Sequence, residues 1–154
     1  MIRSVLMGVV AGMRSMTPLA VVSWAARRQP PAGLDTALPM LSSPTVSKVT
    51  LALAAAELLG DKMRSAPDRI IAPGILARVA TGAIAGAAVA PSRDRPLGAV
   101  LGATVAVGAA YFTLALRKRS IRDRGQTSSG LIEDAVALGA ALWVAHQGRH
   151  EEQW

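Results

Sequence analysis

The stretch Gly-Met-Arg-Ser-Met-Thr-Pro at residues 12–18 interrupts an apolar run within the first 26 residues. Its arginine, Arg14, carries a permanent charge, and its proline, Pro18, removes a backbone hydrogen bond from any helix that contains it. If the run lies in a membrane, both residues need partners from other parts of the chain. The stretch therefore predicts a kinked first helix over residues 1–26, around which the other polar residues are arranged.

The same 26 residues have a second interpretation, a cleaved secretory signal, because Arg3 precedes an apolar stretch. Arg14 shortens that stretch to about nine residues, which favours a helix that is retained. In a retained helix, the hydroxyl groups of Ser15 and Thr17 can satisfy the backbone groups that the proline frees.

The composition favours a membrane over water. Of the 154 residues, 51% are hydrophobic and only 18% are charged, whereas about 25% charged residues is usual in a soluble domain. Aromatic residues make up 3% of the chain, so a soluble core would lack the large side chains that dominate burial energetics. Alanine and glycine instead suit helices that pack closely in lipid. We expect a single integral-membrane domain over residues 1–154, with a polar C-terminal tail at residues 148–154.

The net charge of +7 is compatible with two kinds of partner, nucleic acid and a membrane surface. The basic residues lie mainly between apolar runs, which is typical of flanking charges that orient a membrane protein and not of a nucleic-acid-binding face. The predicted partner is therefore the lipid bilayer, and no nucleic acid is expected. The chain has no cysteine, which excludes disulfides, thiolate metal sites and cysteine nucleophiles.

Four further helices follow the first. A proline-rich loop over residues 27–44 precedes them, and a basic loop over residues 117–124 separates the last two. The clearest span is residues 97–116, twenty residues without a charge. The expected helices cover residues 45–60, 75–90, 97–116 and 131–147.

Residues 8–12 (Gly-Val-Val-Ala-Gly) align without gaps with residues 98–102 (Gly-Ala-Val-Leu-Gly). Either a duplication or the abundance of small apolar residues explains this match. Duplicated helices separated by an odd number of spans would run in opposite directions, as in the inverted repeats of many transporters. The predicted fold is thus all-α, a polytopic membrane bundle of four or five short Gly- and Ala-rich helices, for which an inverted repeat is one plan.

The distribution of basic residues predicts an orientation. If five helices cross the membrane, the side that holds the N-terminus also holds the basic loop at residues 117–124 and is the more positive one. This count places the N-terminus in the cytoplasm. The basic residues assigned to the opposite side are Arg27, Arg28, Arg93, Arg95 and Arg149.

Several motifs resemble a known family. They are residues 12–18, then Glu-Leu-Leu-Gly-Asp-Lys at 57–62 followed by Ala-Pro-Asp-Arg at 66–69, then Arg78, and Gly-Leu-Ile-Glu-Asp-Ala at 130–135. In this order they resemble the bacterial membrane proteins catalogued as domain of unknown function 4126, over nearly the whole chain. The resemblance implies a multispanning inner-membrane protein without an assigned activity, and it transfers no mechanism.

The charged and polar residues of the predicted spans define a candidate site. Charges within membrane spans are costly unless they are paired or hydrated, and they usually mark a solute or proton path. In the alternative, the acidic residues lie at helix ends in the headgroup region and Arg14 is the only deep charge. Arg14 is expected to pair with Glu57 or Asp61 and, failing those, with Glu133 or Asp134. The candidate solute or ion site comprises Arg14, Ser15, Thr17, Glu57, Asp61, Arg78, Glu133 and Asp134.

Two functions are compatible with this pattern. The first is transport or permeation of a small solute or ion through the polar site. The second is a membrane scaffold or assembly protein, a homo-oligomer formed through glycine-rich helix faces that suit close packing. The glycines that define these packing faces are Gly82, Gly86, Gly98 and Gly102.

No enzyme is predicted. The chain has no Gly-rich phosphate loop, zinc-protease motif or nucleophile elbow. His146 and His150 have the spacing of a helical metal site, but Gly148 lies between them near the end of the chain, which favours a solvated tail. We expect neither a metal nor a cofactor.

Overall fold

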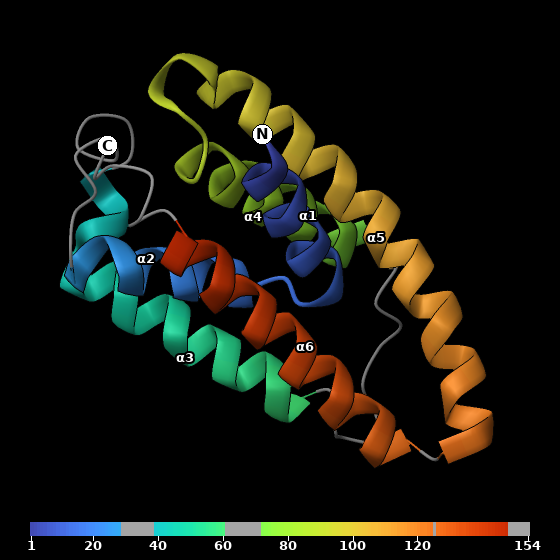
Figure 1. The fold of residues 1–154 in the computed structure, drawn as a ribbon. Helices are drawn as coiled ribbons and strands as arrows, with labels where there is room; N and C mark the ends of the chain where they lie inside the picture. Colours follow the sequence, from blue (N-terminus) through green and yellow to red (C-terminus); the bar gives the residue numbers. More distant parts are fainter. Residues whose placement is uncertain (29–38, 61–71, 125, 148–154) are drawn as a thin grey trace.

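The computed structural model describes residues 1–28, 39–60, 72–124 and 126–147, with side chains for residues 1–28, 40–60, 72–115 and 134–146. Every regular element within these ranges is helical, which confirms the predicted all-α class (Figure 1). The elements are α1 (Ile2–Met13), α2 (Thr17–Arg28), η1 (Pro39–Ser42), α3 (Pro44–Gly60), α4 (Ala72–Ala88), η2 (Ser92–Asp94), α5 (Arg95–Arg124) and α6 (Gln126–Gln147).

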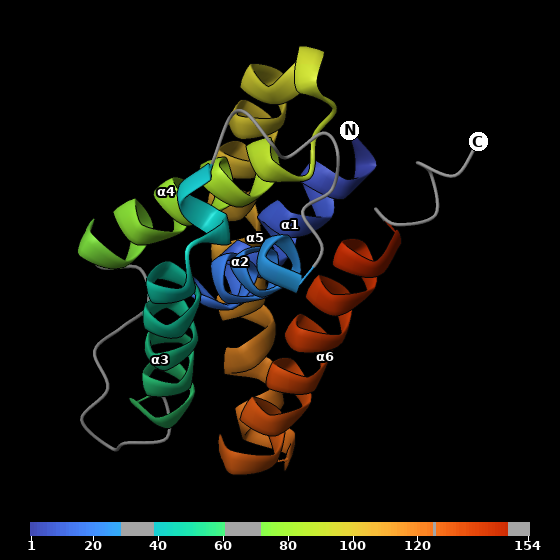
Figure 2. The ribbon, with the colours of Figure 1, turned by 90° about the vertical axis from the view of Figure 1, so that its left-hand side faces the viewer.

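The first 28 residues form a helical hairpin. Met7 of α1 and Ala26 of α2 share one hydrophobic cluster with Val144, whereas Arg14, which lies between them in sequence, pairs with Asp134. Val144 and Asp134 are ten residues apart on α6, which is about 15 Å along the helix. The chain therefore runs along α6 from Met7 to Arg14 and then returns to Ala26. Figures 1 and 2 show this change of direction between α1 and α2. The expected single kinked helix over residues 1–26 is therefore wrong.

The chain reverses at Arg14, whose backbone is extended (φ −140°, ψ 116°). Its N–H still donates to the carbonyl oxygen of Val10 at 2.7 Å, which completes the last turn of α1. Pro18 then lies in the first turn of α2, where its missing N–H costs no helical hydrogen bond. The proline that predicted a kink thus begins a new helix.

Glycines bring α1, α4 and α5 into close contact. A Cβ atom added at Gly8 would lie 2.7 Å from the carbonyl oxygen of Gly102, and one added at Gly82 would lie 2.6 Å from the same atom. Gly86 and Gly98 contact each other in the same way. All four of the predicted packing glycines therefore lie at this contact within one chain.

The order of these contacts fixes the helix directions. Along α1, Ser4 and then Gly8 meet Gly98 and then Gly102 of α5, so α1 and α5 run parallel. The expected inverted repeat required these two helices to run in opposite directions, and the structure does not have that arrangement. Their sequence similarity reflects a shared need for glycine where each helix approaches its neighbours.

The last two helices are longer than expected. The basic segment at residues 117–124 continues α5, because arginine and lysine have high helix propensity. Helix α6 begins at Gln126, five residues earlier than expected. By contrast, α3 and α4 begin within three residues of their predicted starts.

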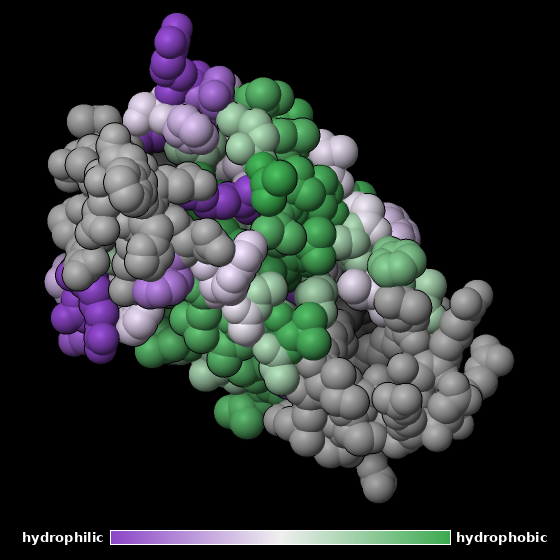
Figure 3. Space-filling model, viewed as in Figure 1, coloured by the Kyte–Doolittle hydropathy of each residue, from purple (hydrophilic) through white to green (hydrophobic). Residues whose placement is uncertain are grey.

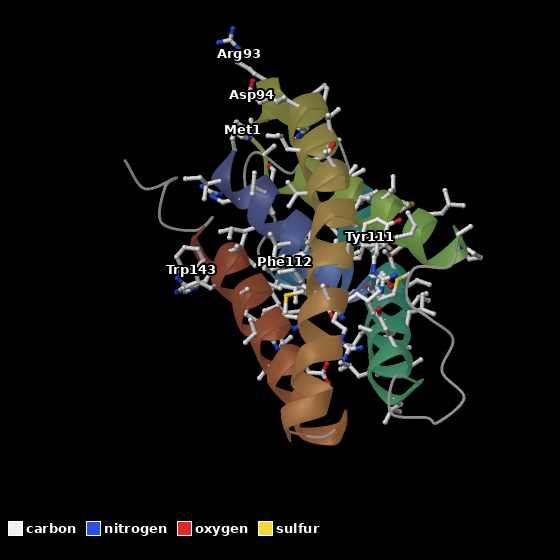
Figure 4. The ribbon with its side chains drawn as sticks, turned by 90° about the vertical axis from the view of Figure 1, so that its right-hand side faces the viewer. Met1, Arg93, Asp94, Tyr111, Phe112 and Trp143 are labelled. Carbon is white, nitrogen blue, oxygen red and sulfur yellow. The ribbon has the colours of Figure 1, made fainter. Side chains whose placement is uncertain are left out.

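Met1, Arg93 and Asp94 lie at the same end of the molecule (Figure 4). Because α2 turns back from the reversal at Arg14, its basic residue Arg28 does not lie across the molecule from the N-terminus. A single helix over residues 1–26 would have placed it there. The count of basic residues over five crossings had assigned the N-terminus and Arg93 to opposite sides of the membrane, whereas Met1 and Arg93 lie at one end here.

Large apolar side chains are exposed on the surface, and several polar and charged residues are buried beside the apolar core. In the face shown in Figure 3, hydrophobic residues gather across the middle and most hydrophilic residues lie toward the upper and left edges. Tyr111, Phe112 and Trp143 point outward at mid-height in Figure 4 and are more than half exposed. Buried polar and charged residues are Ser4, Arg14, Thr17, Ser23, Ser47, Thr50, Arg78 and Thr81.

Within the described residues, one helical segment is both long and apolar enough to cross a membrane, Ser92–Ala115. Three further apolar helical segments are shorter: Ile2–Met13, Ala72–Ala88 and Asp134–His146. By length and composition alone, the structure therefore supports one of the five predicted crossings.

Candidate functional site

The C-terminal end of α1 is held by an arginine from α4. The last carbonyl groups of a helix have no partner within the helix, and this end of the helix carries partial negative charge. Arg78, only 4% exposed, donates from Nε to the carbonyl oxygen of Gly12 at 3.2 Å. Its Nη1 donates to the carbonyl oxygen of Gly74 at 2.9 Å, which joins the end of α1 to the first turn of α4.

The N-terminal end of α2 is held by a carboxylate from α3. Glu57 Oε1 accepts hydrogen bonds from the backbone N–H and the hydroxyl of Ser15, both at 2.8 Å. Glu57 Oε2 accepts from the backbone N–H of Met16 at 2.9 Å. An anion is favourable at this end because the first N–H groups of a helix carry partial positive charge. Glu57 thus supplies the cap that α2 lacks in its own sequence.

Arg14 lies at the reversal and forms an ion pair with Asp134 of α6. Its side chain is 2% exposed and that of Asp134 is 15% exposed. Glu57, the first predicted partner, is instead occupied by the start of α2. Asp134 is one of the two acids predicted to pair with Arg14 if Glu57 and Asp61 do not. The interpretation that Asp134 caps the last helix is wrong, because α6 begins eight residues before it.

The structure thus brings five of the eight predicted site residues together, from five helices or their junctions. Four of these residues have charged side chains, two basic and two acidic. The described part of the site is therefore electrically neutral. Thr17 lies buried in the first turn of α2. The side chain of Glu133 and all of Asp61 lie outside the described residues. The five that meet are Arg14, Ser15, Glu57, Arg78 and Asp134.

The arrangement closes a break in a helix with matched charges. A cation meets the negative end of α1 and an anion meets the positive end of α2, while the Arg14–Asp134 pair ties the break to α6. The site offers hydrogen-bonding groups and charge deep inside the bundle.

A protein-family model described as Domain of unknown function (DUF4126) matches residues 3–146. The chain belongs to this family. The match confirms the resemblance read from the sequence motifs and includes every residue at the helix break. No curated protein and no solved structure matches the chain.

In this DUF4126 chain, an apolar groove of ≈ 430 Å³ lies beside the helix break, between α2, α3 and α6. Each of these helices contributes four lining residues. Thr17 and Asp134 lie at the end of the groove next to the break, and Trp24 lies farther along α2. Sequence reasoning missed this groove, because its lining residues are small or aliphatic and have no local signature.

Hydroxyl groups fix the groove's α2–α3 wall. Ser23 Oγ and Thr50 Oγ1 lie 2.8 Å apart, and Thr50 Oγ1 also donates to the carbonyl oxygen of Val46 at 2.8 Å. With the Ser15–Glu57 contact, this pair shows that α2 and α3 run antiparallel. The two helices are thus joined at two points about two turns apart.

Proposed function

We propose that this protein is a multi-pass protein of the inner (plasma) membrane that moves a small solute or ion through the polar site at the α1–α2 break. The observation that carries the proposal is a break in a helix whose two ends meet charged side chains, the buried Arg78 at α1 and the partly buried Glu57 at α2. Discontinuous helices of this kind form the substrate and ion sites of many transporters near the bilayer midplane.

The proposed depth follows from helix length. Helices α1 and α2 have 12 residues each, which is about 18 Å and a little more than half of the roughly 30 Å hydrocarbon layer. A hairpin of such helices reaches the middle of a bilayer and returns. Non-helical backbone at this depth is tolerated where it is buried in protein, and Arg14 at the reversal is 2% exposed.

The apolar exterior and the buried charges support a membrane location together. Large exposed apolar surfaces mark contact with lipid or protein. An ion pair is not needed merely to fill an interior, because well-packed apolar residues do so at no greater cost. Retaining Arg14 and Asp134 in the centre of the bundle therefore favours a site over a filler.

The hairpin also changes the proposed orientation. The basic segment at residues 117–124 ends α5, whereas Met1 lies at the end where α5 begins. Because basic residues favour the cytoplasm, the end of α5 is placed there and the N-terminus outside. This orientation replaces the cytoplasmic N-terminus expected from five crossings.

The scaffold alternative receives less support. It relied on glycine faces to hold separate chains together, but these glycines already contact one another within one chain. The exterior faces of α5 and α6 carry bulky apolar residues instead, among them Phe112 and Trp143.

Flux measurements test the transport proposal. Wild-type protein in liposomes that contain a dye sensitive to protons, K⁺ or Cl⁻ should carry the corresponding ion under an imposed potential faster than empty liposomes. Glu57→Gln should reduce that flux at least tenfold, because it weakens the anion at the start of α2. Arg93→Ala, at an exposed turn, is the matched control and should keep it. Equal flux in wild-type and Glu57→Gln liposomes would contradict the proposal.

Cysteine labelling tests the orientation, because the chain has no native cysteine. Ile2→Cys and Asp94→Cys, both exposed, should react with a membrane-impermeant maleimide in spheroplasts. Ser120→Cys, near the end of α5, should react only after permeabilisation. Labelling of Asp94→Cys without Ile2→Cys would mean that the N-terminus and the start of α5 lie on opposite sides of the membrane, which would contradict the proposed orientation.

A further inference from the structure

The apolar groove is long enough to hold part of an extended hydrocarbon chain. It follows α2 from Thr17 to Trp24, a length of about 10 Å. Its walls are alanine, valine and leucine side chains, and Leu51, Leu138 and Leu142 on its rim are exposed. The groove is therefore open along its side, where a chain can enter laterally.

Two basic residues lie at one end of the groove. Beyond Trp24, the last turn of α2 carries Arg27 and Arg28, both exposed. The Arg28 guanidinium lies over the Trp24 ring, 4.6 Å from its centroid, in the geometry of a cation–π contact. No acidic side chain in the described part of the chain pairs with either arginine, because the acids near the groove are engaged at the helix break.

The other end of the groove does not call for a cation. Asp134 lines it, but the charge of Asp134 is already met by Arg14. The ligand that complements the whole groove therefore has an apolar chain and an anionic head at the arginine end. A bilayer supplies such a molecule in its anionic phospholipids.

We propose that this groove binds one acyl chain of an anionic phospholipid, with the phosphate headgroup on Arg27 and Arg28. The bound chain covers the exposed side of Asp134 and keeps water from the Arg14–Asp134 pair. This inference rests on the membrane location in the proposed function, but it does not depend on transport.

Fluorescence quenching by brominated lipid chains tests the site. One protein keeps Trp24 as its only tryptophan (Trp143→Phe with Trp154→Phe), and a second keeps only Trp143, which is 54% exposed on α6. Both are placed in phosphatidylcholine vesicles with one tenth phosphatidylglycerol, and bromine is carried by one lipid or the other.

Two basic residues should favour the anionic lipid by roughly 30-fold, so the minor lipid should occupy most of the sites. Trp24 should then be quenched far beyond the one-tenth share when phosphatidylglycerol carries the bromine. Trp143, on the open face, should be quenched in proportion to lipid composition. Arg27→Gln with Arg28→Gln should remove the preference at Trp24.

Two alanines of α3 provide matched variants. Ala55 lines the groove and Ala56 does not, and both side chains are exposed. Ala55→Leu should fill the groove and abolish the excess quenching of Trp24, whereas Ala56→Leu should keep it. Circular dichroism and size-exclusion chromatography check that both variants fold.

Each outcome has a separate meaning. Quenching of Trp143 with only proportional quenching of Trp24 would overturn the lipid site and leave the membrane location intact. Absence of quenching at both tryptophans would overturn the membrane location and the lipid site together. Excess quenching of Trp24 in a protein without measurable flux would support the lipid site and contradict transport.

Discussion

Helix α1 is held in two different ways along its length. Its side packs through Gly8 and Gly12 against α5 with no space for a Cβ atom, and the carbonyl oxygen of Gly12 at its end is held by the charge of Arg78. The first contact depends on volume and contains no charge. The second depends on charge matched to backbone dipoles, beside an open groove. The contrast separates a rigid support from an adaptable site, and each should fail under a different kind of substitution.

The largest loss should come from removing charge at the break. Arg14→Ala leaves Asp134 partly buried without its cation, and breaking a buried pair typically costs about 3 to 5 kcal/mol. Unfolding in detergent, followed by circular dichroism, measures this cost. Arg93→Ala, at an exposed turn, should change stability by no more than about 0.5 kcal/mol.

A second substitution identifies the partner. Arg14→Ala with Asp134→Ala should recover part of the lost stability, because neither charge is then left alone. Arg14→Ala with Glu57→Gln should be worse than Arg14→Ala alone, since Glu57 holds a different helix end. Recovery with Glu57→Gln in place of Asp134→Ala would contradict the pairing seen here.

Added volume should cause the next largest loss, at the glycine contact. A Cβ atom at Gly102 would overlap the backbone of Gly82, which cannot move aside as a flexible side chain can. Gly102→Leu should therefore cost about 1 to 3 kcal/mol or prevent folding, as unfolding in detergent would show. Gly108→Leu is the matched control on the same helix, with nothing within 4 Å of the added Cβ atom.

The control should be neutral or stabilising, because leucine has a higher helix propensity than glycine. Equal losses at Gly102 and Gly108 would mean that the close approach of α4 and α5 is absent in the folded protein. Preserved stability in both variants would also mean that α4 and α5 do not approach closely in the folded protein.

Weakening a cap should cost less than breaking the ion pair. Glu57→Gln keeps an acceptor for Ser15 but removes the negative charge at the start of α2, which is worth up to about 2 kcal/mol in a partly buried setting. Chemical unfolding in detergent measures the change. Asp94→Asn, an exposed acid just before α5, is the control and should show a smaller effect. Comparable losses would mean that the charge of Glu57 does not stabilise the start of α2.

The sequence predicted that the first helix is disturbed near Arg14 and Pro18, although as a kink and not as a reversal, and that the charge there needs partners. Both expectations follow from single residues. Arg14 cannot lose its charge and Pro18 cannot continue a helix, whatever surrounds them. The positions of α3 and α4 likewise follow from local proline and turn signals. These features do not depend on how the helices pack.

The direction of the chain after the break could not be predicted in this way. Pro18 is equally suited to a kink and to the first turn of a new helix, and the contacts that Arg78, Glu57 and Asp134 make at the reversal come from distant parts of the chain. The partner of Arg14 depends on where α6 begins, and the segment before Asp134 has no signal that distinguishes loop from helix. The groove emerges only when three helices are placed together.

The smallest effect should come from the hydroxyl pair that joins α2 to α3 away from the break. Ser23→Ala removes the contact with Thr50 Oγ1, but Thr50 keeps its hydrogen bond to the carbonyl oxygen of Val46. Since no buried group is left unsatisfied, the loss should be about 0.5 to 1 kcal/mol.

Unfolding of Ser23→Ala, Glu57→Gln and the double variant gives the coupling between the two points. If α2 is held at each point independently, the two losses should add within about 0.5 kcal/mol. A larger coupling would mean that α2 moves as a unit once either point is released, and the hairpin would then be the adaptable part of the molecule, against the fixed α1–α4–α5 contact.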